Sequence, residues 1–140
     1  MQIQPYLNFG GRCDEALAFY QKALGAEVTA RFTFGEMPPE AREGQPPLPE
    51  GWDRKIMHAS LRMGDAEWMA SDGMPGAPAE GFAGFSLSIS AGSVDEARKY
   101  VEALSDGGRV MMPVTKTFWT EGFGMVQDRF GVNWMVNVVH

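Results

Sequence analysis

The chain has 140 residues, of which 44% are hydrophobic and 21% charged, a composition typical of one globular domain with its own core. Its formal net charge of −6 and its lack of any Lys/Arg run argue against nucleic acid or an anionic membrane as partner. Its single cysteine, Cys13, excludes an internal disulfide, and no apolar leader follows Met1, so we expect a cytoplasmic protein.

The first half of the chain predicts a strand, a helix and three further strands. Apolar periodicity gives a strand over 2–9, a helix over 13–24, and strands over 27–34, 55–63 and 66–72. Gly25 is placed to end the helix. Residues 35–53 hold five of the nine prolines and predict a long loop, of the kind that often closes over a site.

The second half predicts the same order of elements. A strand is expected over 82–90, a helix over 94–104, a strand over 110–118 broken at Pro113, and a closing hairpin of 123–127 with 133–139. The hairpin turn runs from Asp128 to Gly131, since a glycine at the fourth position can adopt the positive φ of a tight turn.

Short matches in the same order support an internal duplication. The two copies span about residues 1–73 and 82–140, joined by a Gly/Pro/Ala linker over 74–81. The matching segments are Trp68-Met69 with Ser71 against Trp134-Met135 with Asn137, Asp14-Glu15-Ala16 against Asp95-Glu96-Ala97, and Gly25-Ala26-Glu27-Val28 against Gly107-Gly108-Arg109-Val110.

Motifs spread over nearly the whole chain resemble those of the vicinal oxygen chelate superfamily of glyoxalases, bleomycin-resistance proteins and extradiol dioxygenases. Within it the chain looks most like the PhnB-like family. The matching motifs are Pro5-Tyr6-Leu7, Ala18-Phe19-Tyr20, Leu24-Gly25-Ala26, Phe34-Gly35-Glu36-Met37-Pro38, His58-Ala59, Ser71-Asp72, Phe118-Trp119, Gly122-Phe123-Gly124 and the run from Asp128 to Asn137.

The resemblance implies an α+β fold that spans residues 1–140 as a single domain. Two βαβββ modules would form a glyoxalase-like cup of curved sheets, with the helices outside. A small molecule would bind in the cup, and the chain would form a homodimer.

The resemblance also places the superfamily's metal ligands on the first and fourth strands of each module. These positions fall on Met69 and Met135, and near Pro5 and Phe85. None offers the imidazole, carboxylate or thiolate that Zn²⁺, Ni²⁺ or Fe²⁺ prefers. We therefore expect no metal and no other cofactor. The methyltransferase label that the family sometimes carries is also disfavoured, because no Gly-rich turn joins a strand to a helix here.

His58 is the residue best suited to chemistry. Strand alternation places it with Ser60 on the face opposite Ala59 and Leu61, while the following hairpin would set it across from Ser71 and set Ser60 across from Met69. It could act as a general base or as a hydrogen-bond anchor. A purely structural role is an equal alternative.

The other candidates also have two interpretations. Gln127 and Asn137 could orient a ligand beside Met135, or only bond to each other. Aromatic residues could line a pocket or belong to the core. Cys13 could be activated by its place at a helix start or be an inert apolar residue. The candidate pocket residues are His58, Ser60, Met69, Ser71, Phe85, Trp119, Phe123, Gln127, Met135 and Asn137.

Three functions compete. A metal-free protein that binds a small, partly apolar molecule is favoured by the mapped metal positions. An enzyme, either metal-dependent or using His58 as base, is the alternative, and a dimeric scaffold is the third. Arg62 should be neutralised across the hairpin by Glu67, so the predicted ligand is neutral or weakly polar rather than a polyphosphate.

Overall fold

A computed structural model describes residues 1–77 and 80–140. The chain divides into two compact units, Met1–Glu80 and Gly81–His140, and each is described by itself. Among the described residues, no helix is both long enough and apolar enough to span a membrane. Part of the predicted linker over 74–81, namely Pro78 and Ala79, lies outside the described residues.

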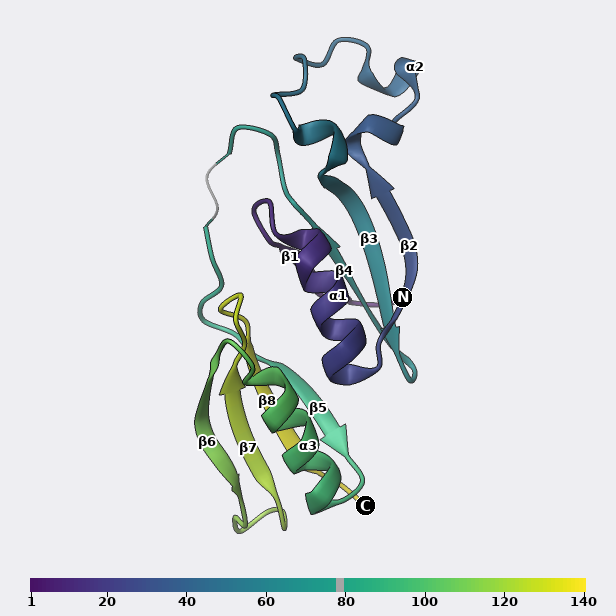
Figure 1. Ribbon diagram of the computed structural model, residues 1–140. Helices are drawn as coiled ribbons and strands as arrows, with labels where there is room; N and C mark the ends of the chain where they lie inside the picture. The colour runs from purple at the N-terminus through teal and green to yellow at the C-terminus, as the bar shows by residue number, and fades with distance from the viewer. Residues whose placement is uncertain (78–79) are drawn as a thin grey trace. The chain divides into compact units, whose positions relative to one another are not determined.

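The first unit is a four-stranded mixed sheet with one long helix (Figure 1). The sheet order is β1-β4-β3-β2, with β1 parallel to β4 and the other neighbours antiparallel. Its regular elements are β1 (Tyr6–Asn8), α1 (Cys13–Leu24), β2 (Glu27–Thr33), β3 (Ile56–Met63) and β4 (Ala66–Ser71).

The second unit repeats this plan, with the sheet order β5-β8-β7-β6 and only β5 and β8 parallel. Its elements are β5 (Leu87–Ala91), α3 (Val94–Leu104), β6 (Arg109–Thr115), β7 (Phe123–Gln127) and β8 (Asn133–Val138). The predicted pair of βαβββ modules is therefore confirmed.

In each unit the helix covers one face of the sheet (Figure 1). In the first unit, the rings of Tyr20 on α1 and Trp68 on β4 pack edge to face with centroids 6.4 Å apart. In the second, Val101 on α3 is buried, as are Val126 on β7 and Val136 on β8. Because strand side chains alternate between faces, every sheet also has a face that its own helix does not cover, called here the open face.

Two buried carboxylates hold irregular backbone in place. Asp72 follows β4 and accepts hydrogen bonds from the backbone N–H groups of Gly11 and Cys13, each at 2.8 Å, and of Ile56 at 2.7 Å. The start of α1 and the start of β3 are thereby tied to the end of β4. A buried carboxylate with three donors is well satisfied, so Asp72 has a structural role.

Asp128 closes the hairpin between β7 and β8. Its carboxylate accepts from the N–H groups of Phe130 at 2.9 Å and Val132 at 3.0 Å, and from the indole of Trp134 at 2.9 Å. Gly131 has φ of 89° and donates to the Asp128 carbonyl at 3.0 Å. The tight turn predicted from Asp128 to Gly131 is confirmed.

Several predicted boundaries were wrong. The strand expected over 82–90 begins only at Leu87, because Gly84 takes a φ of 80° that interrupts extended backbone. The strand expected over 110–118 with a break at Pro113 is one strand, Arg109–Thr115, although its pairing with β7 is irregular between Met112 and Thr115. This strand is β6, at the sheet edge, where the N–H that proline lacks costs no ladder bond.

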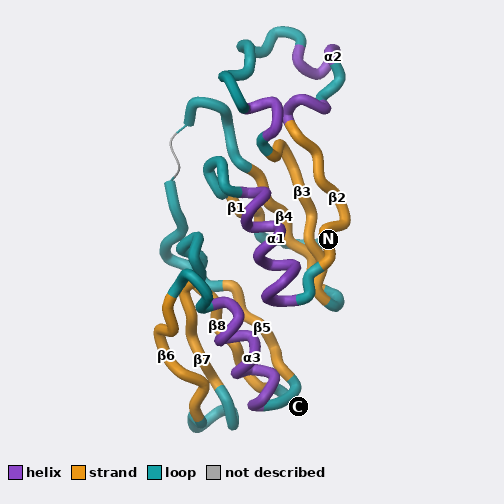
Figure 2. Tube along the Cα trace, viewed as in Figure 1, coloured by secondary structure: helices purple, strands orange, loops and turns teal. Residues whose placement is uncertain are grey.

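The segment between β2 and β3 is not simply a loop. It contains the short helical turns η1 (Phe34–Glu36), α2 (Pro39–Arg42) and η2 (Trp52–Arg54). Figure 2 shows it extending beyond the ends of the two strands. The carboxylate of Glu36 accepts from the N–H and the hydroxyl of Thr33 at 3.2 and 2.9 Å, which fixes the entry into η1 and lowers the pKa of Glu36.

Candidate ligand-binding faces

On the first unit, the open face brings together residues of three strands. Ser60 on β3 pairs with Met69 on β4, as predicted. On its other side Met69 pairs with Tyr6 of the parallel strand β1. His58 lies two residues before Ser60 on β3 and therefore shares its face.

His58 lies in a chain of hydrogen bonds. The Tyr6 hydroxyl is 3.0 Å from Nδ1 of the imidazole, the two ring centroids are 5.6 Å apart, and the Ser60 hydroxyl is 3.3 Å from Nε2. Partial burial raises the pKa of the Tyr6 phenol, so it stays protonated and is the natural donor to Nδ1. In the neutral imidazole Nε2 then carries the proton and donates to Ser60.

This arrangement bears on the role of His58. With Nδ1 accepting from Tyr6, Nε2 carries the proton and is a donor rather than a base, and a ligand oxygen that binds His58 would take the place of the Ser60 hydroxyl. Tyr6 was missed as a site residue in the sequence. Its motif Pro5-Tyr6-Leu7 carries the family resemblance, but the parallel pairing of β1 with β4, which brings Tyr6 to His58, leaves no periodic signal.

Ser71 is occupied within the fold. Its hydroxyl donates to the carbonyl of Met57 at 2.8 Å and accepts from the N–H of Gly73 at 3.0 Å, and the residue is only 7% exposed. It therefore secures the end of β4, beside Asp72.

On the second unit, the open face carries three cross-strand pairs. From one end of the β7–β8 hairpin to the other, they are Gln127 with Asn133, Met125 with Met135, and Phe123 with Asn137. Two methionines at the centre give a soft apolar patch that adapts to different shapes. Amides lie on both sides of it.

The amides Gln127 and Asn137 do not satisfy each other. Gln127 donates to Asn133 at 3.3 Å, whereas the Asn137 carbonyl accepts from the indole N–H of Trp119 at 3.2 Å. The second bond fixes both the amide and the indole. The alternative in which these two amides bond to each other is therefore wrong, because each amide is held by a different neighbour.

Aromatic rings gather next to Asn137. The Trp119 ring packs against Phe123 and Phe118, with centroids 5.3 and 4.9 Å away and steeply inclined planes. Phe118 is 97% exposed and Trp119 54% exposed, so these two do not belong to the core. Phe85 lies apart in sequence, before β5, and its ring packs against Phe82 at 6.3 Å.

A hollow of about 480 Å³ opens beside this aromatic group. It is lined by Trp119 and Asn137 together with the end of β8 and the segment before β7. The imidazole of His140 hydrogen-bonds to the carboxylate of Glu121 at its border. The hollow is within the size range of small-molecule sites.

The register corrects one of the predicted metal-ligand positions. Ser88, not Phe85, pairs with Met135, and Tyr6 pairs with Met69. Two thioethers, a phenol and an aliphatic hydroxyl are a poor donor set for Zn²⁺, Ni²⁺ or Fe²⁺. Over residues 1–77 and 80–140, no group of three His, Cys, Asp or Glu side chains is placed to hold a metal ion. The residues present do not fit the superfamily's metal.

One expectation about charge was wrong, and for Cys13 the structure favours the inert alternative. Cys13 begins α1, yet burial and the nearby carboxylate of Asp72 raise the pKa of its thiol instead of lowering it. Arg62 pairs in register with Glu67, but its guanidinium bonds to Glu27 of β2 at 2.6 Å. Glu67 instead accepts a hydrogen bond from Gln4 at 3.4 Å.

Comparison with known proteins agrees with this architecture. Residues 2–136 match the sequence model of the Glyoxalase/Bleomycin resistance protein/Dioxygenase superfamily. Protein YjdN from Escherichia coli K12 is 41% identical over 142 residues, covering 99% of this chain and 96% of its own.

Solved structures give the same result. Protein PA1353 from Pseudomonas aeruginosa has 45% identity and a TM-score of 0.84, with 99% of this chain and 97% of that chain covered. The PhnB protein from Bacillus cereus shares the fold, with a TM-score of 0.76 at 21% identity and coverage of 99% and 100%. The chain belongs to the Glyoxalase/Bleomycin resistance protein/Dioxygenase superfamily, with the PhnB-like fold within it.

Proposed function

We propose that this protein binds a small, neutral or weakly polar molecule with an aromatic or aliphatic body on its open sheet faces, without the superfamily's metal. The observation that carries the proposal is the exposed aromatic group of Phe118 and Trp119, held against Phe123 and Asn137. Large aromatic surfaces left in water are a common sign of a binding site.

The geometry of this group suits recognition of an apolar body. The bond to Asn137 fixes the Trp119 indole, so little side-chain freedom remains to be lost when a ligand packs against it. Met125 and Met135 extend the apolar surface along the hairpin. The amide nitrogen of Asn137 is oriented by the same bond and offers a donor to a ligand.

The first unit supplies polar anchors. The chain from Tyr6 through His58 to Ser60 presents two hydroxyls and an imidazole on its open face, and no Lys or Arg is among the candidate pocket residues. A polyphosphate would need such cations. A neutral ligand with one or two oxygens fits these groups better.

A metal-independent enzyme is the second candidate. The observation that favours it is the 3.3 Å contact between the Ser60 hydroxyl and Nε2 of His58, the arrangement in which a base activates a hydroxyl. That role requires the tautomer with the proton on Nδ1, in which Tyr6 accepts rather than donates. An activity that is lost in a folded His58→Gln variant would identify this enzyme.

A homodimer in the cytoplasm is also part of the proposal. Strand β6 lies at a sheet edge and exposes Val110, Met111 and Met112, a surface that unprotected would favour association. The one cysteine is buried, which suits a reducing compartment. Light scattering that gives twice the chain mass at micromolar concentration is the expected result, and a monomer mass would refute the dimer.

Methionine-methyl NMR tests the ligand class. The protein is labelled with ¹³C at the methionine methyl groups and titrated with 2-naphthol and, separately, with ATP. We expect 2-naphthol to shift the signals of Met125 and Met135, because this pair follows the Phe123–Asn137 pair on the open face, and ATP to shift neither. If ATP shifts them and 2-naphthol does not, the proposed function is wrong.

A further inference from the structure

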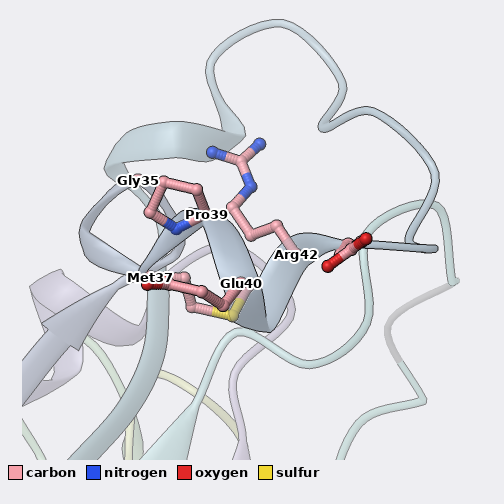
Figure 3. Close-up of a pocket in the computed structure, with 6 residues that line it drawn as sticks. Gly35, Met37, Pro39, Glu40 and Arg42 are labelled. Atoms are coloured by element: carbon pink, nitrogen blue, oxygen red, sulfur yellow. The ribbon is translucent and has the colours of Figure 1, made fainter.

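The segment between β2 and β3 builds two hollows that the proposed function does not use. One measures about 290 Å³ and the other, more open, about 760 Å³. They share the side chains of Met37 and Arg42, and Figure 3 shows the residues of the larger one. The smaller hollow is the more enclosed and is the subject here.

Ring packing, backbone hydrogen bonds and prolines shape the smaller hollow. Phe34 at its base is buried and packs edge to face with Trp52, the ring centroids lying 5.6 Å apart. Backbone hydrogen bonds from Gln45 to the Arg42 carbonyl and from Trp52 to the Pro49 carbonyl, both 3.0 Å, shape the rim. Four prolines also line it, and prolines limit collapse because their φ is fixed.

Among the described residues, Arg42 is the one charged side chain that lines this hollow. It is half-buried, and within residues 1–77 and 80–140 it has no ion-pair partner, whereas Arg12, Arg31 and Arg62 each pair with a carboxylate. Figure 3 shows its side chain in an extended conformation. In a chain with a net charge of −6, an unpaired cation above an apolar hollow is unusual.

We infer that this hollow is a second binding site, for a small amphiphilic carboxylate. The carboxylate accepts two parallel N–H bonds from the Arg42 guanidinium, the geometry that arginine favours. The apolar body packs against Phe34, Met37 and Leu48. A volume of 290 Å³ equals that of about ten waters, so a medium-chain fatty acid or a one-ring aromatic acid fits, and a long-chain lipid does not.

Octanoate is the probe for this site, with octanol and octylamine as matched compounds of the same chain length. In the methionine-methyl spectrum we expect octanoate to shift Met37 and Met74, both of which line the hollow. The fluorescence of Trp52, isolated by comparison with Trp52→Phe, should change in parallel. Octanol and octylamine should bind at least tenfold more weakly.

Variants of Arg42 and Arg54, two arginines in the same segment, distinguish a specific ion pair with the ligand from a general effect of positive charge. Arg42→Met keeps the length and removes the cation, and we expect octanoate to bind at least tenfold more weakly. Arg54→Met removes an exposed cation of η2 that lines neither hollow and should leave the affinity unchanged. Arg42→Lys should restore part of the loss.

Each other outcome overturns the inference. Equal binding by Arg42→Met, or equal binding of octanol, means that no carboxylate pairs with Arg42. Shifts at Met69 and Met135 in place of Met37 and Met74 put octanoate on the open sheet faces, and the absence of any shift means that the hollow takes no such ligand. Failure of 2-naphthol to bind leaves this site untouched, so the two proposals fail separately.

Discussion

The two units share a topology and differ in the chemistry of their open faces. Both have a parallel pair next to an antiparallel three-stranded meander, and both bury Trp and alternating small apolar residues under the helix. The first unit then presents Tyr6, His58 and Ser60, whereas the second presents aromatic rings, methionines and amides. Helix packing constrains one face of each sheet, and the other face is where the copies have diverged.

The same comparison explains the missing metal site. Equivalent positions on the two open faces hold Met69 with Tyr6 and Met135 with Ser88. A metal needs donors from these places, and both copies have instead apolar or weakly donating side chains. What remains is an apolar surface on the open face of the second unit and a set of hydrogen-bonding groups on the open face of the first.

The largest expected effect is on stability. Asp72 joins three separate segments, so Asp72→Ala should lower the free energy of unfolding by about 3–5 kcal/mol, because buried N–H donors at Cys13 and Ile56 lose their acceptor. Asp128→Ala, which opens one local turn, should cost less. Urea unfolding of both variants measures the difference. A larger loss of stability in Asp128→Ala than in Asp72→Ala would contradict this prediction.

Variants on each open face test which of the two takes part in binding. Trp119→Ala is expected to weaken 2-naphthol binding by about 2 kcal/mol, or roughly thirtyfold, since it removes the central aromatic anchor. His58→Ala should cost about 1–3 kcal/mol if a buried hydrogen bond is lost. Trp52→Phe is the control for loss of a tryptophan elsewhere. If calorimetric titration shows that Trp119→Ala leaves the affinity for 2-naphthol unchanged, the second unit does not take part in binding.

Prediction from sequence succeeded where periodicity is strong. Both long helices were placed with their correct bounds, Cys13–Leu24 and Val94–Leu104, because each has a clear apolar stripe. The hairpin β7–β8 followed from its turn residues. Pairing between distant strands was harder: the register that brings Tyr6 to His58 and Ser88 to Met135 is set by tertiary packing and has no local signature.

Side-chain partners were the least predictable part. Arg62 forms an ion pair with Glu27 rather than with its cross-strand neighbour Glu67, since long side chains reach several acceptors. Helical turns between β2 and β3 were hidden by the proline content, although proline is well accepted in the first turn of a helix. For Cys13, where two alternatives were open, burial outweighs the position at a helix start.

The Cys13 thiol gives a pH dependence of moderate size. Its pKa is raised in the folded chain. Its contribution to the free energy of unfolding is therefore fully present below the pKa of the unfolded thiol, about 8.5. Above that pH the unfolded chain ionises first, and stability should fall by up to about 1.4 kcal/mol per pH unit. Urea unfolding of the protein and of Cys13→Ala between pH 7.5 and 9.5 isolates this slope, and parallel curves would contradict it.

The smallest effect concerns the surface ion pair of the first unit. Glu27→Gln should lower the free energy of unfolding by no more than about 0.5 kcal/mol, because both partners are half-exposed. Glu67→Gln, which leaves the Arg62–Glu27 bond intact, should change it less. A double-mutant cycle with Arg62→Gln measures each coupling, and a stronger coupling to Glu67 would restore the pairing expected across the hairpin.

Binding without a metal is the central claim, and one measurement tests it most directly. Calorimetric titration with 2-naphthol is carried out on untagged protein dialysed against EDTA and on the same protein supplied with equimolar Zn²⁺ or Ni²⁺. Apart from His58, the residues proposed to face the ligand offer no imidazole, carboxylate or thiolate, so the affinity should be the same in all samples, with no stoichiometric metal retained. Binding that disappears with EDTA and returns with one metal ion per chain would contradict the account.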